Sequence, residues 1–187
     1  MKEFLISKFG EKRGTELADL QKAKFEKLLS EAGPKSKQQM KVFKNMLLPR
    51  VAMYKVLREE GFSEEDALKV MEEHMVEVGA ADLKKKYAGM DKLPCAFALF
   101  KFGFTHVVPS SDLWDADIEK TKDSFSVTMK RCFWHDTYEE YGCPEVCQFA
   151  CQCDDITYGD LRHIKYERTE TLGTGGKCCD FHFSKRK

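Results

Sequence analysis

The pattern of hydrophobic and polar positions divides the chain into two parts with different periods. Up to about residue 110, apolar residues recur every three or four positions, which is typical of helices with one buried face. After that point they alternate with polar residues, which favours β-strands. The pattern predicts an α+β protein, with a helical portion over 1–110 packed on an antiparallel sheet with inserted helices over 111–187.

Helical spacing with recognisable ends occurs in six stretches. These stretches are 11–32, about 36–60, 63–78, the apolar run after Pro94, about 144–152 and about 157–162. Ser63 and Asp66 resemble a capping box that starts the third helix, and Gly79 is expected to end it. Pro49 either kinks the second helix or occupies the first turn of a new one. The run after Pro94 is predicted as a buried helix, with a strand as the alternative.

Alternating positions predict a small sheet after a loop over 106–112. The expected strands are about 114–118, 125–133, 165–172 and 179–183. The first two form a hairpin that turns at Lys122 and Asp123, and the glycine-rich segment LGTGGK connects the last two. A phosphate-binding loop is the weaker interpretation of this segment, because it precedes a strand and lacks a helix N-terminus. In the last strand, Cys179 is expected to face inward and Asp180 outward.

Composition restricts the partners and the surroundings of the protein. The 187 residues include 31 basic and 31 acidic side chains, so no net charge attracts nucleic acid or an anionic membrane. No apolar run approaches the roughly 20 residues that span a bilayer, and charges interrupt the first segment. We expect a single cytoplasmic domain that binds a small molecule, without nucleic acid or membrane as partner.

Five of the eight cysteines lie between 132 and 154. Reduced thiols are expected, because Cys143, Cys147 and Cys151 are spaced for one helix face and not for local cross-links. A stripe of three thiols is compatible with zinc, but packing as small apolar side chains is favoured, since paired CxxC spacing is missing. Cys143 at a helix N-terminus is also a candidate reactive thiolate. His135 and His163 are isolated and are interpreted as surface or capping residues.

Several spaced motifs together resemble the L-2-amino-thiazoline-4-carboxylic acid hydrolase family. They are a strand ending in Cys132, G-x-P-E at 142–145, Cys151, Asp154, and R-T-x-T-L-G-x-G-G-x-x-C-D-F at 168–181. The resemblance is strongest over 125–183, is looser over 48–78, and is missing from the first thirty residues.

The resemblance implies a hydrolase without a cofactor or metal, which opens the thiazoline ring of a cyclic cysteine derivative to N-carbamoyl-L-cysteine. The candidate catalytic residues that match the family pattern are Cys132, Glu145, Cys151, Asp154, Cys179 and Asp180. The other cysteines of this region, Cys143, Cys147, Cys153 and Cys178, lie outside the pattern.

The residue types fit two mechanisms, and the sequence leaves both open. A carboxylate binds the protonated amidine and activates water, or a thiol attacks the ring carbon directly. Arg131 or Arg168 is expected to bind the substrate carboxylate through a bidentate contact. A binding module without turnover and a zinc-stabilised module that uses Cys143, Cys147, Cys151 and Cys179 are the alternatives.

Overall fold

The computed structural model describes residues 1–186, except for the side chain of Asp82. Its α-helices are α1 (Lys2–Phe9), α2 (Glu11–Ser30), α3 (Lys37–Val42), α4 (Leu48–Glu59), α5 (Glu64–Glu72), α6 (Ala80–Ala88), α7 (Ala96–Val107), α8 (Phe133–Glu140) and α9 (Cys147–Gly159). Shorter helical segments are the π-helices η1 (Phe43–Leu47) and η2 (Glu73–Gly79) and the 3-10 helices η3 (Met90–Lys92), η4 (Pro144–Val146) and η5 (Leu172–Thr174). The strands are β1 (Trp114–Lys120), β2 (Ser124–Cys132), β3 (Ile164–Glu167) and β4 (Cys179–Lys185).

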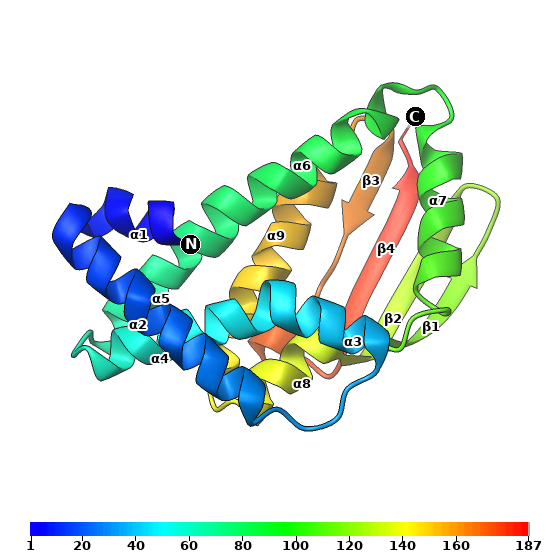
Figure 1. The fold of residues 1–187 in the computed structure, drawn as a ribbon. Coiled ribbons are helices and arrows are strands. Elements are labelled where there is room, and N and C mark those ends of the chain that lie inside the picture. Colours follow the sequence, from blue (N-terminus) through cyan, green and yellow to red (C-terminus); the bar gives the residue numbers. More distant parts are fainter. Residues whose placement is uncertain (187) are drawn as a thin grey trace.

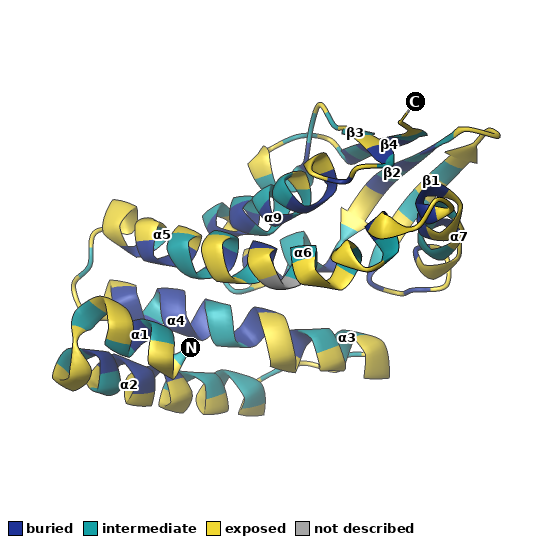
Figure 2. Cartoon of the chain, turned by 90° about the horizontal axis from the view of Figure 1, so that it is seen from above, coloured by how far each residue is buried: buried dark blue, intermediate teal, exposed yellow. Residues whose placement is uncertain are grey.

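The helical part lies on one side of the molecule and the sheet on the other (Figures 1 and 2). Viewed from above, α1, α2 and α4 form an outer layer, and the continuous rod of α5, η2 and α6 lies between that layer and α9 (Figure 2). Leu17 of α2 and Leu47, Val51 and Met71 from η1, α4 and α5 are buried together in this part. Within the described residues, no helix is both long and apolar enough to cross a membrane.

The helices largely follow the predicted ends, and α2 and α7 confirm the helices expected over 11–32 and after Pro94. Pro49 lies in the first turn of α4, directly after the π-helical segment η1. Of the two predicted alternatives, it therefore occupies the first turn of a helix. Ser63 caps α5 by accepting the backbone N–H of Asp66 at 3.0 Å. The helix α1 was not predicted.

Two helix ends differ from the prediction. Gly79 does not end its helix, because its φ of −68° is helical and the chain continues through η2 into α6. A Cβ at Gly79 would lie 3.6 Å from the Arg50 guanidinium and 3.8 Å from Cys153 Sγ, which are ordinary contact distances. The predicted loop over 106–112 also begins too early, because α7 extends through Val107.

The four strands form one antiparallel sheet in the order β1-β2-β4-β3, which confirms the α+β class and the predicted hairpin. Phe125 of β2 pairs with Phe183 of β4, and both side chains are buried. Phe100 of α7 and Tyr158 of α9 contact Phe183 and each other, so both helices cover the same face of the sheet.

The C-terminal boundaries required three corrections. β2 ends at Cys132, and Phe133 begins the unpredicted helix α8. The separate helix predicted over 157–162 is wrong, because α9 runs without a break from Cys147 to Gly159. β3 ends at Glu167 and not at 172, since the N–H groups of Thr169 and Glu170 bond to the Asp180 carboxylate.

Helix α9 connects the two hydrophobic clusters of the molecule. Cys147 and Phe149 near its N-terminus belong to the cluster of the helical part. Tyr158 near its C-terminus belongs to the cluster beneath the sheet. The middle of α9 therefore lies at the junction of the two clusters, and this is where most of the cysteines gather.

Candidate active site

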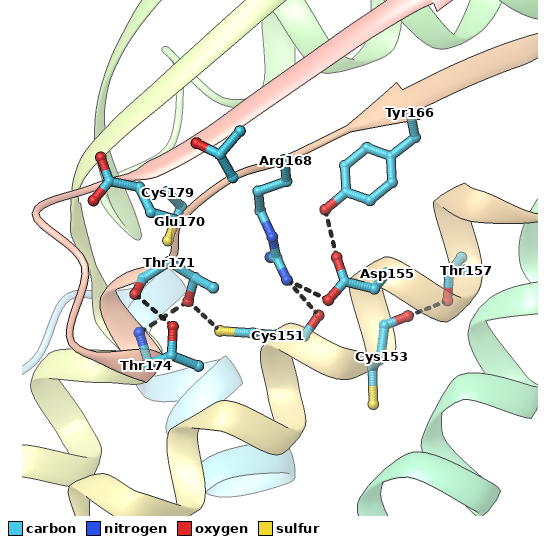
Figure 3. Close-up of polar contacts among 12 residues, drawn as sticks. Cys151, Cys153, Asp155, Thr157, Tyr166, Arg168, Glu170, Thr171, Thr174 and Cys179 are labelled. Carbon is cyan, nitrogen blue, oxygen red and sulfur yellow. Dashed lines mark hydrogen bonds and ion pairs between the residues drawn. The ribbon is translucent and has the colours of Figure 1, made fainter.

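One face of α9 points toward the sheet. Cys147, Cys151, Asp154 and Tyr158 are spaced by four, three and four positions, which places them in one stripe on a helix. Cys151 contacts Thr171 across the gap, with 2.9 Å between Sγ and Oγ1 (Figure 3). Near the other end of the stripe, Tyr158 packs on the aromatic core of the sheet. The sheet-facing stripe is therefore polar and sulfur-rich at one end and aromatic at the other.

Four thiols converge on the sulfur-rich end. They come from three elements and are called the thiol cluster here: Cys132, Cys147, Cys151 and Cys179. Cys132 ends β2 and Cys179 begins β4, so the neighbouring strands bring these two thiols to one edge of the sheet. Negative charge on Cys151 raises the pKa of both Cys132 and Cys179, after burial as the larger cause.

Cys151 is the thiol of the cluster that is prepared to ionise. A hydrogen bond from the Cys147 thiol is the largest cause that lowers its pKa, to about 6. Burial opposes this effect, but the Thr171 hydroxyl, the charge of Arg168 and the backbone N–H of Gly173 all favour the thiolate. The same hydrogen bond raises the pKa of the donor, Cys147, far above its ordinary value.

Gly173 allows the backbone of η5 to lie against the two α9 thiols. A Cβ at this position would be 2.8 Å from Cys151 Sγ and 3.1 Å from Cys147 Sγ. Thr171 Oγ1 accepts the Gly173 N–H at 3.0 Å, which holds the turn in this position. The glycine-rich turn therefore acts as a close-fitting cover over Cys151, with an N–H group directed at the sulfur.

Arg168 supplies the positive charge of the site. Its side chain is only 5% exposed, and its Nη2 donates to the Cys151 backbone carbonyl at 3.1 Å and to Asp155 at 2.6 Å (Figure 3). Tyr166 donates a second hydrogen bond to Asp155 at 2.9 Å. The Nη1 atom is buried and has no hydrogen-bond partner among the described residues. A buried guanidinium with an unused donor is prepared to bind an anionic group.

Asp154 is a carboxyl group with an unusual proton affinity. Desolvation by its surroundings is the largest cause that raises its pKa to about 7, although the charge of Arg168 opposes it. Negative charge on Cys151 and Asp155 raises the pKa further. None of the hydrogen bonds found among residues 1–186 reaches this carboxylate. A carboxyl that titrates near neutrality, one helical turn from Cys151, is suited to general acid–base catalysis.

The fold brings together some of the predicted site residues and separates others. Glu145 in η4 accepts a short hydrogen bond from the Tyr54 hydroxyl of α4. Asp180 lies on the opposite strand face from Cys179, and its carboxylate accepts the N–H groups of Thr169 and Glu170 at 2.9 and 2.8 Å. The cluster contains Cys132, Cys151 and Cys179, with Asp154 and Arg168 beside them.

Arg131 was the second candidate for binding the substrate carboxylate. Its guanidinium donates to Asp136 at 2.9 Å and to the Asp112 carbonyl at 3.1 Å, on the exposed side of β2. Within the described residues, none of its hydrogen bonds reaches the thiol cluster. Arg168 is therefore the arginine that lies at the cysteines.

The part of the chain over 39–183 matches the family described as L-2-amino-thiazoline-4-carboxylic acid hydrolase. The chain belongs to this family. The match includes every member of the thiol cluster as well as Arg168 and Asp154, and it confirms the resemblance drawn from the spaced motifs.

Other comparisons give little further information about this hydrolase-family chain. No curated protein sequence matches it. Two solved structures of an H-NOX protein from K. algicida, both in the unliganded Fe(II) form and one of them a mutant, are 15% identical to it. They align over 100% of this chain and over 95% and 92% of theirs, with TM-scores of 0.34 and 0.35.

Cys143 is buried, in agreement with the favoured packing role. It precedes η4 with a non-helical backbone, so the stripe of three helical cysteines does not form. Burial raises the pKa of the Cys143 thiol to about 12, which is opposite to the alternative of a reactive thiolate at a helix N-terminus. Cys153 faces the other side of α9, where its thiol donates to the Met75 carbonyl at 3.0 Å.

Metal-binding groups and surface hollows were sought around the family motifs. Among residues 1–186, no group of three or more Cys, His, Asp or Glu side chains is arranged to hold a metal ion. A surface hollow of about 270 Å³ lies between α2 and α4, and another of about 180 Å³ lies between α6 and the end of α9. Neither hollow is lined by a cysteine.

Sequence reasoning missed four contributors to this hydrolase-family site. They are Cys147, Thr171, Gly173 and Asp155. The spacing of Cys147 four residues before Cys151 was visible, but it was assigned to packing. Thr171 and Gly173 belong to the motif at 168–181, but the motif does not reveal their role, because each acts on a sulfur about 20 residues away. Their role depends on how the β3–β4 connection folds back over α9.

Proposed function

We propose that this chain is a hydrolase that opens a small cyclic amidine, of the kind represented by 2-amino-thiazoline-4-carboxylate, to an N-carbamoyl-cysteine product. The observation that carries the proposal is the environment of Cys151. A thiol whose pKa is about 6 is largely ionised at neutral pH, and the thiolate is the nucleophilic form. Family membership supports the same reaction class.

The proposed reaction begins with attack of the Cys151 thiolate on the amidine carbon of the ring. The bond from that carbon to the ring sulfur then breaks, and the released substrate thiolate takes a proton. This step leaves an isothiouronium group linked to Cys151. Water adds to the same carbon, the bond to Cys151 breaks, and the carbamoyl product and the thiolate are released. One water is consumed, and no electrons are exchanged.

The other residues of the site have separate roles in this scheme. Asp154, with a pKa of about 7, delivers the proton to the leaving sulfur and later removes one from the attacking water. Arg168 binds the substrate carboxylate through its unused Nη1. Because η5 covers the cysteines, the turn that contains Gly173 has to lift for the substrate to reach them.

The decisive experiment compares two cysteines of the same helix. Purified protein is incubated with L-2-amino-thiazoline-4-carboxylate, and product that contains one added water is measured by mass spectrometry. We expect Cys151→Ser to lower kcat by at least roughly 10²-fold, because an alcohol at this position is not ionised. Cys153→Ser, whose side chain points away from the cluster, retains most of the activity.

The outcomes separate the mechanism from the function. Full activity in Cys151→Ser with a normal thermal midpoint excludes thiol attack and leaves water activated by Asp154. Saturable binding of the compound without product in the wild-type protein identifies a binding module and removes the hydrolase proposal.

A further inference from the structure

The two α9 thiols of the cluster lie at one point beneath the glycine-rich turn. A single Cβ position at Gly173 is 2.8 Å from one sulfur and 3.1 Å from the other. The Cys147 thiol donates its hydrogen to Cys151. Cys147 lowers the pKa of Cys151, but its own sulfur makes or breaks no bond in the ring-opening steps proposed above, and Cys147 lies outside the family pattern. The second thiol therefore calls for its own explanation.

The helix spacing brings the pair near the range of a covalent bond. Residues four apart in an α-helix have Cα atoms ~6.2 Å apart, within the range of about 4.4–6.8 Å seen in disulfides. Their Cβ atoms are about 5–6 Å apart, whereas a disulfide needs about 3.5–4.5 Å, so bond formation requires the first turn of α9 to distort by about 1–2 Å. Cys147 and Cys151 lie at the N-terminal end of α9, where the chain has just left the 3-10 helix η4.

The two thiols differ in exposure in the way that a reacting and a resolving cysteine require. Cys151 is half-buried, whereas Cys147 is only 2% exposed. A small oxidant reaches the first and not the second. Once Cys151 is oxidised, the nearest nucleophile is the protected thiol that already contacts it.

The other members of the thiol cluster are less suitable partners. Cys179 Sγ accepts the Leu172 N–H at 3.4 Å, and Cys179 is fixed in the first position of β4. Cys132 ends β2, one strand away from Cys179. Bonding either one to Cys151 would link α9 to the sheet, whereas Cys147 shares the helix of Cys151.

We propose that Cys147 and Cys151 form a peroxide-sensitive modification site, in which Cys151 is oxidised and Cys147 resolves it as an intrahelical disulfide. In the first step, the Cys151 thiolate attacks a peroxide oxygen; the oxygen–oxygen bond breaks, sulfenic acid and hydroxide form, and the hydroxide takes a proton from solvent to become water. In the second step, the Cys147 sulfur attacks the sulfenic sulfur and releases a second water. Cys151 is oxidised and the peroxide is reduced. A dithiol restores both thiols by exchange.

The consequence for activity rests on the proposed function. The disulfide removes the Cys151 nucleophile, so hydrolysis stops until a dithiol reductant is added. It also protects Cys151 from the irreversible sulfinic and sulfonic acids. The site therefore switches off reversibly under oxidative conditions, where a lone cysteine is destroyed.

The test maps the disulfide in the full-length protein. The protein is treated with hydrogen peroxide, free thiols are alkylated in denaturant, and chymotrypsin then cleaves after Phe149, which lies between the two cysteines. We expect the peptide with Cys147 to stay linked to the peptide with Cys151 until dithiothreitol is added. Cys153→Ala and Cys143→Ala remove the neighbouring cysteines from the two peptides and are expected to keep the link.

The resolving role is tested with Cys147→Ser, which retains a hydrogen-bond donor beside Cys151. We expect this variant to accumulate sulfinic and sulfonic acid on Cys151 and to lose dithiothreitol-reversible recovery, with a thermal midpoint near that of the wild type. A wild-type disulfide from Cys151 to Cys132 or Cys179 overturns the proposal. So does equal over-oxidation of Cys151 in wild type and variant.

Disulfide mapping requires no substrate, so the two proposals fail separately. A protein that forms the Cys147–Cys151 bond but hydrolyses no cyclic amidine retains the modification site and loses the proposed function. A protein that hydrolyses the substrate but forms no Cys147–Cys151 bond retains the proposed function and loses the modification site.

Discussion

The two faces of α9 carry cysteines two positions apart that behave in opposite ways. On the sheet-facing side, hydrogen bonds led by the one from Cys147 lower the pKa of Cys151 to about 6. On the other side, burial raises the pKa of Cys153 to about 11, and its thiol donates to the Met75 carbonyl. The residue type and the helix are the same. The fold places hydrogen-bond donors opposite Cys151 Sγ and a carbonyl acceptor opposite Cys153 Sγ, and this makes the difference.

The largest expected loss of activity comes from replacing Arg168. Its positive charge lies on the sheet-facing side of α9, beside Cys151. Arg168→Gln is expected to lower kcat/KM by roughly 10²–10³-fold, because a buried charged donor to the substrate carboxylate is lost. The pKa of Cys151 should also rise, since Arg168 favours its thiolate. Steady-state kinetics check the first effect, and Arg131→Gln is the matched control. An equal loss in the control would contradict the assignment.

The second prediction concerns the protonation state of the Asp154 carboxyl on the sheet-facing side of α9. Its pKa in the folded protein, about 7, lies above the ordinary value of 3.8. The folded state therefore binds a proton more tightly than the unfolded state, and this stabilisation is lost as the pH rises through 7. Asp154→Asn should raise the free energy of unfolding at pH 8, by at most about 4 kcal/mol, and by less at pH 5.

Urea unfolding at the two pH values measures this difference. Asp155→Asn is the control, because Asp155 accepts hydrogen bonds from Arg168 and Tyr166. That variant should lose stability at both pH values. A pH-independent effect of Asp154→Asn would show that its carboxyl is not protonated in the folded state.

Gly173 tests the close cover over Cys151. Gly173→Ala places a methyl group 2.8 Å from Cys151 Sγ and 3.2 Å from the Cys147 backbone, so the turn has to shift. We expect a destabilisation of about 1–3 kcal/mol together with reduced turnover. Thermal unfolding and kinetics report the two effects. Gly159→Ala, which meets open space at the end of α9, should change neither by much.

The smallest and most specific expected change is a shift in the pKa of Cys151 when Thr171 is replaced. Thr171→Val removes the hydroxyl that lies 2.9 Å from Cys151 Sγ while preserving the side-chain shape. The pKa of Cys151 should rise by about one unit, which corresponds to one hydrogen bond of about 1.4 kcal/mol. The pH dependence of alkylation by iodoacetamide measures it. Thr174→Val, which removes a bond to the Thr171 carbonyl, should leave the midpoint near 6.

Much of the fold could be predicted because its signals are local. Ser63 ahead of α5, Pro49 in the first turn of α4 and the alternation around Phe125 all act within a few residues. The errors occurred where distant groups intervened. β3 stops early because Asp180 of β4 accepts the N–H groups of Thr169 and Glu170.

For the candidate site too, local motifs identified residues, and tertiary contacts decided which of them lie together. Cys151, Asp154 and Arg168 were identified from motifs, and the fold places them together. Asp180 and Arg131 carried equally suggestive residue types, but their side chains are engaged elsewhere. Residue type selects candidates, while side-chain direction decides among them.

The sequence by itself determined the α+β class, most helix ends, the hairpin and the family. These properties depend on periodicity, capping and motif spacing, which act over short stretches of chain. Only the tertiary structure decided which cysteine has a lowered pKa. Cys147 on the same helix is the largest cause, and Thr171, Arg168 and Gly173 add to it by reaching back to α9 across roughly 20 residues. A thiol pKa depends on the donors and charges within a few ångströms, which motif spacing does not specify.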